Sequence, residues 1–183
     1  MANTTGKKIK DAAIIGGCAS LIYLTIGDIS YRLSLSRGGL NSKLITDMVA
    51  KSAAKKPKNE YKEKLDSMID DGADWFMHQD TEKIIIEKKH RQSLYADLIR
   101  PDKPSNVYII CIHGYTSSPA NMGIYAKKYH ELGYNVLLPS LRGHGDSEQD
   151  FITMGWNDRL DVIEWINYIA ERHPESKIIL HGV

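Results

Sequence analysis

Three glycine-containing segments carry the residue types in this sequence that could do chemistry. They are Ile112 to Thr116 (IHGYT), Pro139 to Ser147 (PSLRGHGDS) and Leu180 to Val183 (LHGV). Imidazole can transfer protons near neutral pH, guanidinium can bind carboxylates, and glycine lets backbone N–H groups approach a ligand closely. In open parallel sheets such groups work outside the carboxyl ends of the strands. We therefore expect a site where the three segments meet.

The histidines and cysteines do not by themselves predict catalysis or a metal site. His144 and His181 flank the expected site, but neither has an ordered partner that would make it a base. The sequence holds no H-E-x-x-H motif and no closely spaced cysteine pair, so we expect no metal. Cys111 lies in an apolar run and is expected to be an inert, buried thiol. Cys18 lies in an apolar leader, and nothing predicts a disulfide.

The segments are expected at the ends of strands in a β-hairpin followed by a β-α-β-α-β unit. Residues 83–89 and 93–100 alternate in polarity as an antiparallel hairpin does, with a turn near His90. The other expected strands are 107–112, 134–138 and 177–180; helices are expected from Ser118 and Pro119 to Gly133 and over 157–172. Strands that alternate with helices at short connections predict an α/β fold with a parallel sheet.

Helical spacing of apolar residues predicts which helix faces are buried. The run 107–112 is continuously apolar, which predicts a strand covered on both faces. Trp75 and Phe76 are expected to close an edge of the core. The first helix is expected to bury Met122, Tyr125, Ala126, Tyr129 and Leu132, and the second to bury Val162, Ile163, Ile166 and Ile169.

The N-terminal region has the charge pattern of a membrane segment. Lys7, Lys8 and Lys10 precede the stretch 12–27, which contains no charged residue. As a helix this stretch would be about 24 Å long, short against a hydrocarbon core of about 30 Å, so the expected segment extends over 12–31. We expect an uncleaved signal anchor with a single span in the cell membrane. The flanking charges favour the bulk of the chain on the extracytoplasmic side.

Three alternatives to the anchor stay open. A signal peptide could be cleaved and the protein secreted, because the apolar region of such peptides needs only about 7–15 residues. The sequence Ile15-Gly16-Gly17-Cys18 could precede a lipidated cysteine. The stretch could also be a buried helix of a soluble protein.

The charge distribution separates a basic leader from an acidic domain. Residues 1–64 hold 12 Lys and Arg against 5 Asp and Glu, whereas residues 65–183 hold 12 against 18. The net charge of +1 argues against nucleic acid as the main partner, and 42% hydrophobic residues indicate a globular protein. The six lysines over 51–64 are expected to face solvent or, alternatively, anionic lipid headgroups. The expected organisation is a basic N-terminus (1–11), a membrane segment (12–31), a helical stalk (32–81) and an α/β domain (82–183).

Four motifs stand in order along residues 82–183. They are HGYTSSP after one strand, ELGYNVLLPSLRGHGDSE across the next, MGWNDRLDVIEWI at the start of a helix, and KIILHGV. In this order they resemble the α/β-hydrolase superfamily, most closely the bacterial membrane-anchored hydrolases related to serine aminopeptidases and acyl-ester hydrolases. The resemblance implies that 82–183 is the N-terminal half of an α/β-hydrolase sheet, a partial domain. It implies a small-molecule or peptide acyl substrate and no metal or organic cofactor.

The resemblance also assigns roles to residues of the first two segments. The backbone N–H of Tyr115 would be one donor of the oxyanion hole, and Gly114 would let the backbone approach the substrate closely. His113 would orient the loop by hydrogen bonding rather than transfer protons. The loop that shapes the wall of the site matches at Arg142, Gly143 and Gly145, with the Arg142 side chain holding carbonyls or carboxylates. The family often has Asp where Ser140 stands, so that detail of the loop stays open.

The nucleophile of the family lies in a G-x-S-x-G turn, and here Gly182 and Val183 supply only its first two positions. The serine would be the next residue, and the acid and the histidine would follow it, so the chain as given holds none of the triad. We expect an incomplete serine hydrolase that, when complete, cleaves ester, thioester or amide bonds through an acyl-enzyme. One alternative is a non-catalytic, membrane-tethered binding or regulatory protein. The other keeps the fold but has Asp as the nucleophile.

Overall fold

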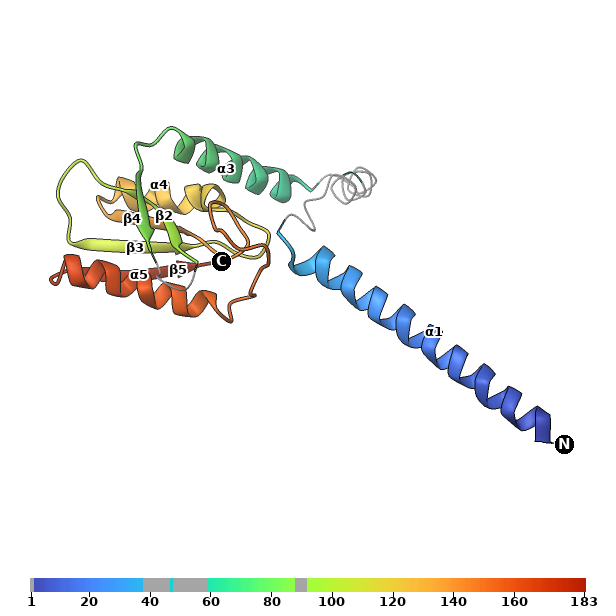
Figure 1. Cartoon of the computed structure of the whole chain (residues 1–183). Coiled ribbons are helices and arrows are strands. Elements are labelled where there is room, and N and C mark those ends of the chain that lie inside the picture. Colours follow the sequence, from blue (N-terminus) through green and yellow to red (C-terminus); the bar gives the residue numbers. More distant parts are fainter. Residues whose placement is uncertain (1, 38–46, 48–58, 88–91) are drawn as a thin grey trace.

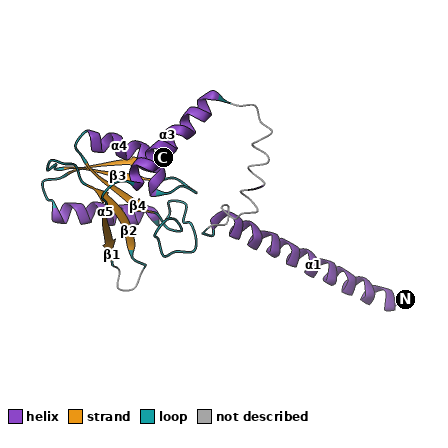
Figure 2. Ribbon diagram, turned by 90° about the horizontal axis from the view of Figure 1, so that it is seen from above, coloured by secondary structure: helices purple, strands orange, loops and turns teal. Residues whose placement is uncertain are grey.

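The computed structural model describes residues 2–37, 47, 59–87 and 92–183 of the 183-residue chain. The expected turn near His90 and the lysines between residues 51 and 58 lie outside the described residues. The described elements from residue 60 onward form three layers, with a mixed sheet between helices on either side (Figure 1). Figure 2 shows the same layers from above.

In the part of the chain that the structure describes, five strands form one sheet in the order β1-β2-β4-β3-β5. The strands are β1 (Glu82–Ile86), β2 (Leu94–Ile99), β3 (Val107–Ile112), β4 (Asn135–Ser140) and β5 (Lys177–Gly182). β1 and β2 form the predicted antiparallel hairpin, and β2 pairs antiparallel with β4. β3 lies parallel between β4 and β5, so the prediction of three parallel strands is also confirmed. The carboxyl ends of these three strands therefore lie at the same edge of the sheet.

The helices begin and end where local chemistry favours it. They are α1 (Ala2–Leu35), α3 (Glu60–Met77), the 3-10 helix η1 (Pro119–Met122), α4 (Gly123–Glu131) and α5 (Asp158–Arg172). The side chain of Asn59 accepts hydrogen bonds from two N–H groups in the first turn of α3, which satisfies donors that a helix start leaves free. Pro119 begins η1 as predicted, where its missing N–H costs nothing. Gly133, with φ +79°, ends α4 in the left-handed conformation that glycine favours.

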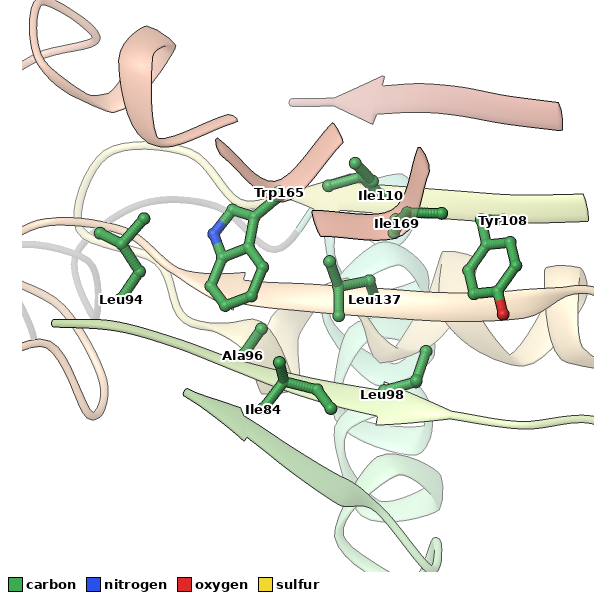
Figure 3. Close-up of a cluster of buried hydrophobic side chains, with 9 residues drawn as sticks. All are labelled: Ile84, Leu94, Ala96, Leu98, Tyr108, Ile110, Leu137, Trp165 and Ile169. Atoms are coloured by element: carbon green, nitrogen blue, oxygen red, sulfur yellow. The ribbon is translucent and has the colours of Figure 1, made fainter. Parts of the chain in front are cut away.

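The strands divide their side chains between two cores because successive residues of a strand point to opposite faces. One core joins the sheet to Trp165 and Ile169 of α5, and Figure 3 shows both side chains pointing toward the strands. Its other buried members are Ile84, Leu94, Ala96, Leu98, Tyr108, Ile110 and Leu137. The opposite core lies under α3 and α4 and contains Phe76, Ile99, Ile109, Cys111, Met122, Ala126, Val136 and Leu138. The prediction that 107–112 is covered on both faces is confirmed, as is the position of Trp75 and Phe76 at the edge of this core.

α3 contacts the start of α4 backbone to backbone, through Gly72 and Gly123. A Cβ atom on Gly72 would lie 2.3 Å from the backbone nitrogen of Ile124, and one on Gly123 would lie 2.0 Å from the carbonyl oxygen of Gly72. No side chain fits into such a gap without moving a helix. The glycines thus let α3, which falls in the range expected to be a stalk, pack tightly against α4.

The predicted helix faces are wrong at three positions. Tyr125 on α4 and Leu132 directly after it are 36% and 64% exposed, and Ile163 on α5 is 51% exposed. Trp165, which the apolar spacing missed, is 1% exposed and takes the central place under α5. The reason is that the apolar stripe is wider than the surface that each helix turns toward the sheet, and bulky Trp165 fills that surface on α5.

α1 projects away from the sheet (Figure 1), and its apolar side chains from Leu21 to Leu33 are exposed. Asp28 and Arg32 form an ion pair on it, with 2.8 Å between Oδ2 and Nε. Among the described residues, no helix combines the length and the apolar character that crossing a bilayer requires. The expected membrane anchor over 12–31 is therefore not supported by the described residues.

Candidate functional site

The loops after β3 and β4 and the end of β5 meet at one edge of the sheet, as the sequence segments predict. The parallel register places Cys111 beside His181 and Ile112 beside Gly182. The N–H of Val183 continues this pairing by donating to the carbonyl oxygen of Ile112 at 3.3 Å. Gly182 and Val183 therefore lie directly beside the start of the IHGYT loop.

Gly114 brings this loop into contact with Val183. A Cβ atom on Gly114 would lie 2.9 Å from the carbonyl oxygen of Val183, closer than real Cβ contacts, so the contact requires glycine. The next residues turn sharply, with Thr116 in the left-handed region at φ +56°. The N–H of Thr116 donates to the His144 ring, whereas no hydrogen bond between described residues starts at the N–H of Tyr115. The Tyr115 N–H, directly after Gly114 in the chain, thus has no hydrogen-bond partner among the described residues.

His113 is 2% exposed and joins the two loops. Its Nδ1 lies 3.0 Å from the carbonyl oxygen of Gly114, and its Nε2 accepts the N–H of Leu141 at 3.2 Å. Burial lowers the pKa of His113 below its ordinary value of 6.5 because it penalises the charged ring. A neutral ring with both nitrogens bound to backbone orients loops and is poorly suited to transferring protons. This geometry is what the expected role of His113 requires.

His144 makes the matching connection in the opposite direction. It lies in the loop after β4, is 9% exposed, and its Nε2 accepts the Thr116 N–H at 3.1 Å. Its Nδ1 lies 2.9 Å from the carbonyl oxygen of Arg142. The rings of His113 and His144 meet edge to face with their centroids 4.9 Å apart. The two histidines therefore lie together between the loops after β3 and β4.

Arg142 connects this loop to α5. Its guanidinium binds both carboxylate oxygens of Asp161, at 2.6 Å from Nε and 2.8 Å from the terminal nitrogen. These hydrogen bonds raise the pKa of Arg142, and the pair is mostly buried. Asp158, one helical turn before Asp161, accepts the Arg142 N–H at 3.3 Å. Its other oxygen accepts the Gly155 N–H at 2.8 Å and the Thr153 hydroxyl at 2.7 Å, so α5 holds both ends of the loop.

The glycines of the RGHG sequence are favoured by their backbone conformation and, at Gly143, by a close backbone contact. Gly143 and Gly145 have φ +75° and +51°, a region that costs other residues conformational energy. A Cβ atom on Gly143 would lie 2.8 Å from the backbone of Phe151, and one on Gly145 would lie 2.6 Å from Oγ of Ser140. Ser140 itself accepts the N–H of Asp146 at 3.3 Å, so its hydroxyl supports the turn.

A hollow of about 590 Å³ adjoins these loops. Its lining includes His113, Gly114 and Tyr115. The remaining lining is mainly apolar and comes from both the loops and α5, with Ile112, Leu141, Ile152, Met154, Val162, Ile163, Ile166 and Leu180 among its members. An apolar recess beside a few polar groups is typical of small-molecule sites.

The last turn of α1 and the two described residues after it lie against the site, which the sequence analysis missed. The Tyr115 hydroxyl donates to the carbonyl oxygen of Ser34, and Ser36 forms an antiparallel bridge with Phe151. The Arg37 guanidinium donates to two carbonyl oxygens of the neighbouring loop, those of Gly145 and Ser147. No local pattern in the sequence announces these contacts, because they join residues about a hundred positions apart.

His181 and Cys111, the other residues that the sequence analysis considered, contact neighbouring elements rather than the site loops. The His181 Nδ1 lies 2.7 Å from the Tyr129 hydroxyl and so faces α4. Cys111 is fully buried, and burial raises its pKa to about 12, so the prediction of an inert thiol is confirmed. The described residues contain no cluster of three or more His, Cys, Asp or Glu that could hold a metal ion. The sequence analysis gave no role to three residues that hold the loops, Thr116, Asp158 and Asp161. The spacing of the two aspartates within NDRLD at the start of a helix could have indicated them.

No family model matches the chain. A search of curated proteins finds the thermostable monoacylglycerol lipase of Bacillus sp. (strain H-257), which is 28% identical over 38% of this chain and 37% of the lipase. Among solved structures, an esterase of Pyrococcus furiosus matches with a TM-score of 0.52 and 28% identity, over 58% of this chain and 42% of the esterase. The chain thus spans well under half the length of these relatives. These matches confirm, over slightly more than half of the chain, the resemblance to the α/β-hydrolase superfamily that the ordered motifs predict.

Proposed function

We propose that this chain forms the N-terminal part of a serine hydrolase of small-molecule carboxylic esters, with the attacking serine directly after Val183. The single observation that carries the proposal is the contact of Gly114 with Val183. It brings the HGY loop to the two residues that begin the G-x-S-x-G turn, where a Cβ on Gly114 would lie 2.9 Å from the Val183 oxygen. A serine at the following position would stand beside the Tyr115 N–H.

The proposed reaction follows from this juxtaposition. The serine hydroxyl attacks the ester carbonyl while a histidine base takes its proton, and the alcohol leaves to give an acyl-enzyme that water hydrolyses. Negative charge on the carbonyl oxygen in the intermediate is stabilised by the Tyr115 N–H. Such a donor is worth about 3 kcal/mol when it is held in place before the reaction.

The substrate class is supported by the hollow and by the relatives. The hollow reaches His113, Gly114 and Tyr115, and the part of its lining that the loop after β4 supplies is apolar at Leu141, Ile152 and Met154. An apolar acyl or alcohol group would lie against these loop residues next to the reacting carbonyl. One relative is named a monoacylglycerol lipase and another an esterase. We therefore place esters before thioesters and amides.

The test begins with the nucleotides that follow the codon for Val183. We expect them to encode Ser-x-Gly and a longer reading frame. Its product should hydrolyse p-nitrophenyl esters and be labelled by a fluorophosphonate, and replacing the new serine by alanine should abolish both. An aspartate or a stop codon at that position, or ester turnover that survives the alanine replacement, would contradict the proposal.

The oxyanion donor is tested in the same longer protein. Tyr115→Pro removes the N–H and should lower kcat by about 100- to 1000-fold, the usual effect of losing one oxyanion donor. Tyr115→Phe keeps the N–H and removes only the hydroxyl that binds Ser34, so it serves as the matched control. An equal fall in kcat in the two variants would show that the Tyr115 N–H does not stabilise the transition state.

A further inference from the structure

We propose that His113 and His144 are positioning residues that together hold the Tyr115 N–H in place, each ring accepting a backbone N–H from the loop to which the other belongs. The structural part of this inference stands on the geometry of the described loops. Its catalytic consequence rests on the function proposed above. Neither histidine would touch the substrate as a base.

The hydrogen bonds assign the same tautomer to both rings. Nε2 of His113 accepts the Leu141 N–H and Nε2 of His144 accepts the Thr116 N–H, and a backbone N–H can only donate. Each Nε2 is therefore unprotonated. Each Nδ1 lies within 3.0 Å of a carbonyl oxygen, which can only accept, so each Nδ1 carries the proton. Both rings are neutral, and every ring nitrogen has a backbone partner.

The exchange is reciprocal between the two loops. His113 belongs to the loop after β3 and binds Leu141 of the loop after β4, at 3.2 Å. His144 belongs to the loop after β4 and binds Thr116 of the loop after β3, at 3.1 Å. The rings also pack edge to face at 4.9 Å, so neither can leave its place without disturbing the other. Removing one ring should thus loosen both loops.

The bond to Thr116 is the one that bears on Tyr115. Thr116 has φ +56°, which is costly for a threonine and persists only where its surroundings hold it. The His144 ring supplies that restraint one residue after Tyr115. If the restraint were lost, the turn at Thr116 could relax, and the change would pass through Tyr115 to the peptide between Gly114 and Tyr115. That peptide carries the Tyr115 N–H, which would then turn away from the oxyanion position.

The His144 ring is held in turn by α5. Its Nδ1 donates to the carbonyl oxygen of Arg142, whose side chain binds Asp161 at 2.6 Å and whose N–H binds Asp158. The restraint therefore runs from a regular helix through Arg142 and His144 to the turn that carries Tyr115. A donor aimed before the reaction stabilises the charge without reorganising during it.

The test uses the 183-residue chain labelled with ¹⁵N. The ring nitrogens of His113 and His144 should show the Nδ1–H tautomer in both cases. His144→Ala should raise the amide exchange rate of Thr116 at least about tenfold, the change that corresponds to about 1.4 kcal/mol. It should also raise that of Leu141, which binds the other ring. His113→Ala should raise the amide exchange rate of Leu141, which binds the deleted ring, by at least about tenfold, and it should also raise that of Thr116, which binds the other ring.

Two variants separate positioning from simple loss of folding. His144→Gln places a carbonyl oxygen near the position of Nε2 and should restore much of the protection at Thr116. His78→Ala removes an exposed histidine at the end of α3 and should change neither amide. Urea denaturation of each variant shows whether the exchange is local or follows global unfolding. Exchange that changes only at the amide bound to the deleted ring, or that Gln does not restore, would overturn the reciprocal arrangement.

The catalytic consequence is read in the longer protein. His144→Ala should lower kcat for a p-nitrophenyl ester at least about tenfold with little change in KM, because only the transition-state contact is lost. His144→Gln should recover part of the loss. An active parent whose kcat is unchanged by His144→Ala would overturn the positioning role. An inactive parent would instead refute the proposed function, while the exchange rates would still decide whether the histidines hold the loops.

Discussion

β3 (VYIICI) and β5 (KIILHG) are neighbouring parallel strands, and each has consecutive apolar residues at its centre, yet their surroundings differ. Along β3, Ile109, Ile110 and Cys111 are fully buried. Along β5, Ile179 and Leu180 are 47% and 50% exposed, on opposite faces of the sheet. β3 has a strand on either side and helices over both faces. β5 is the last strand of the described sheet and has a neighbour only on the β3 side.

The difference teaches that neighbours, rather than the apolar run itself, decide whether a strand is buried. An exposed apolar edge strand invites pairing with further chain or with another molecule. This is the part of the molecule where the proposed remainder of a hydrolase would add its strands and helices. Gly114 follows the covered strand β3 and contacts Val183, which follows the exposed strand β5. The site therefore lies between a covered strand and an exposed one.

The largest effect that would sharpen this contrast is the loss of a buried side chain from β3. Ile110→Ala should lower the free energy of unfolding by about 2–5 kcal/mol, because it removes buried contacts and leaves a cavity. Leu180→Ala on β5 removes a half-exposed side chain and should cost only about 1 kcal/mol. Urea denaturation measures both changes. Equal losses would mean that β5 is as well covered as β3.

The next largest change in the free energy of unfolding is expected in the loop between β4 and α5, where Asp161 binds Arg142. Asp161→Ala removes both hydrogen bonds to the mostly buried Arg142 guanidinium and should lower the free energy of unfolding by about 1.5–3 kcal/mol. Glu175→Ala, at an exposed position beyond the same helix, is the control and should change stability by less than about 0.5 kcal/mol. Denaturation curves that do not distinguish the two would mean that the pair contributes nothing.

The pH dependence of stability tests the burial of His113 at the end of β3. Its pKa is lowered in the folded protein, chiefly by burial, with a smaller contribution from His144. Below the ordinary value of 6.5 the unfolded chain therefore binds more protons than the folded chain, and stability falls as the pH falls. Denaturation between about pH 5 and about pH 8 should show this slope for the parent and a shallower one for His113→Gln. Identical slopes would contradict the burial of the ring.

The smallest effect on stability is expected from a cysteine substitution on β5, which lets thiol reactivity compare the exposure of the two strands. In a Cys18→Ser background, Cys111 on β3 should react with a thiol reagent only on unfolding, because it is buried and its pKa is about 12. Adding Leu180→Cys on β5 should introduce a thiol that reacts in the folded protein, at a cost in stability below about 1 kcal/mol. Slow labelling of that second thiol would indicate that another surface covers β5.

The strands and the three site segments could be predicted because each has a local signal. The apolar run of β3 and the glycine that ends α4 identify their elements without reference to the rest of the chain. Trp165 under α5 and the contact between Gly72 and Gly123 could not be predicted, because they depend on which surface another element presents. The same holds for the bonds that join Ser34 and Arg37 to the site.

The sequence by itself determined the order of the strands along the chain and the glycine that ends α4, because the conformations of these segments follow from neighbouring residues. It also determined which residues stand at the strand ends, His113 and His144 among them. Only the tertiary structure decided that each of these rings binds the loop of the other, and that β3 is covered while β5 is not. Hydrogen-bond partners and buried area come from residues distant in sequence, and no local pattern specifies which of them will meet.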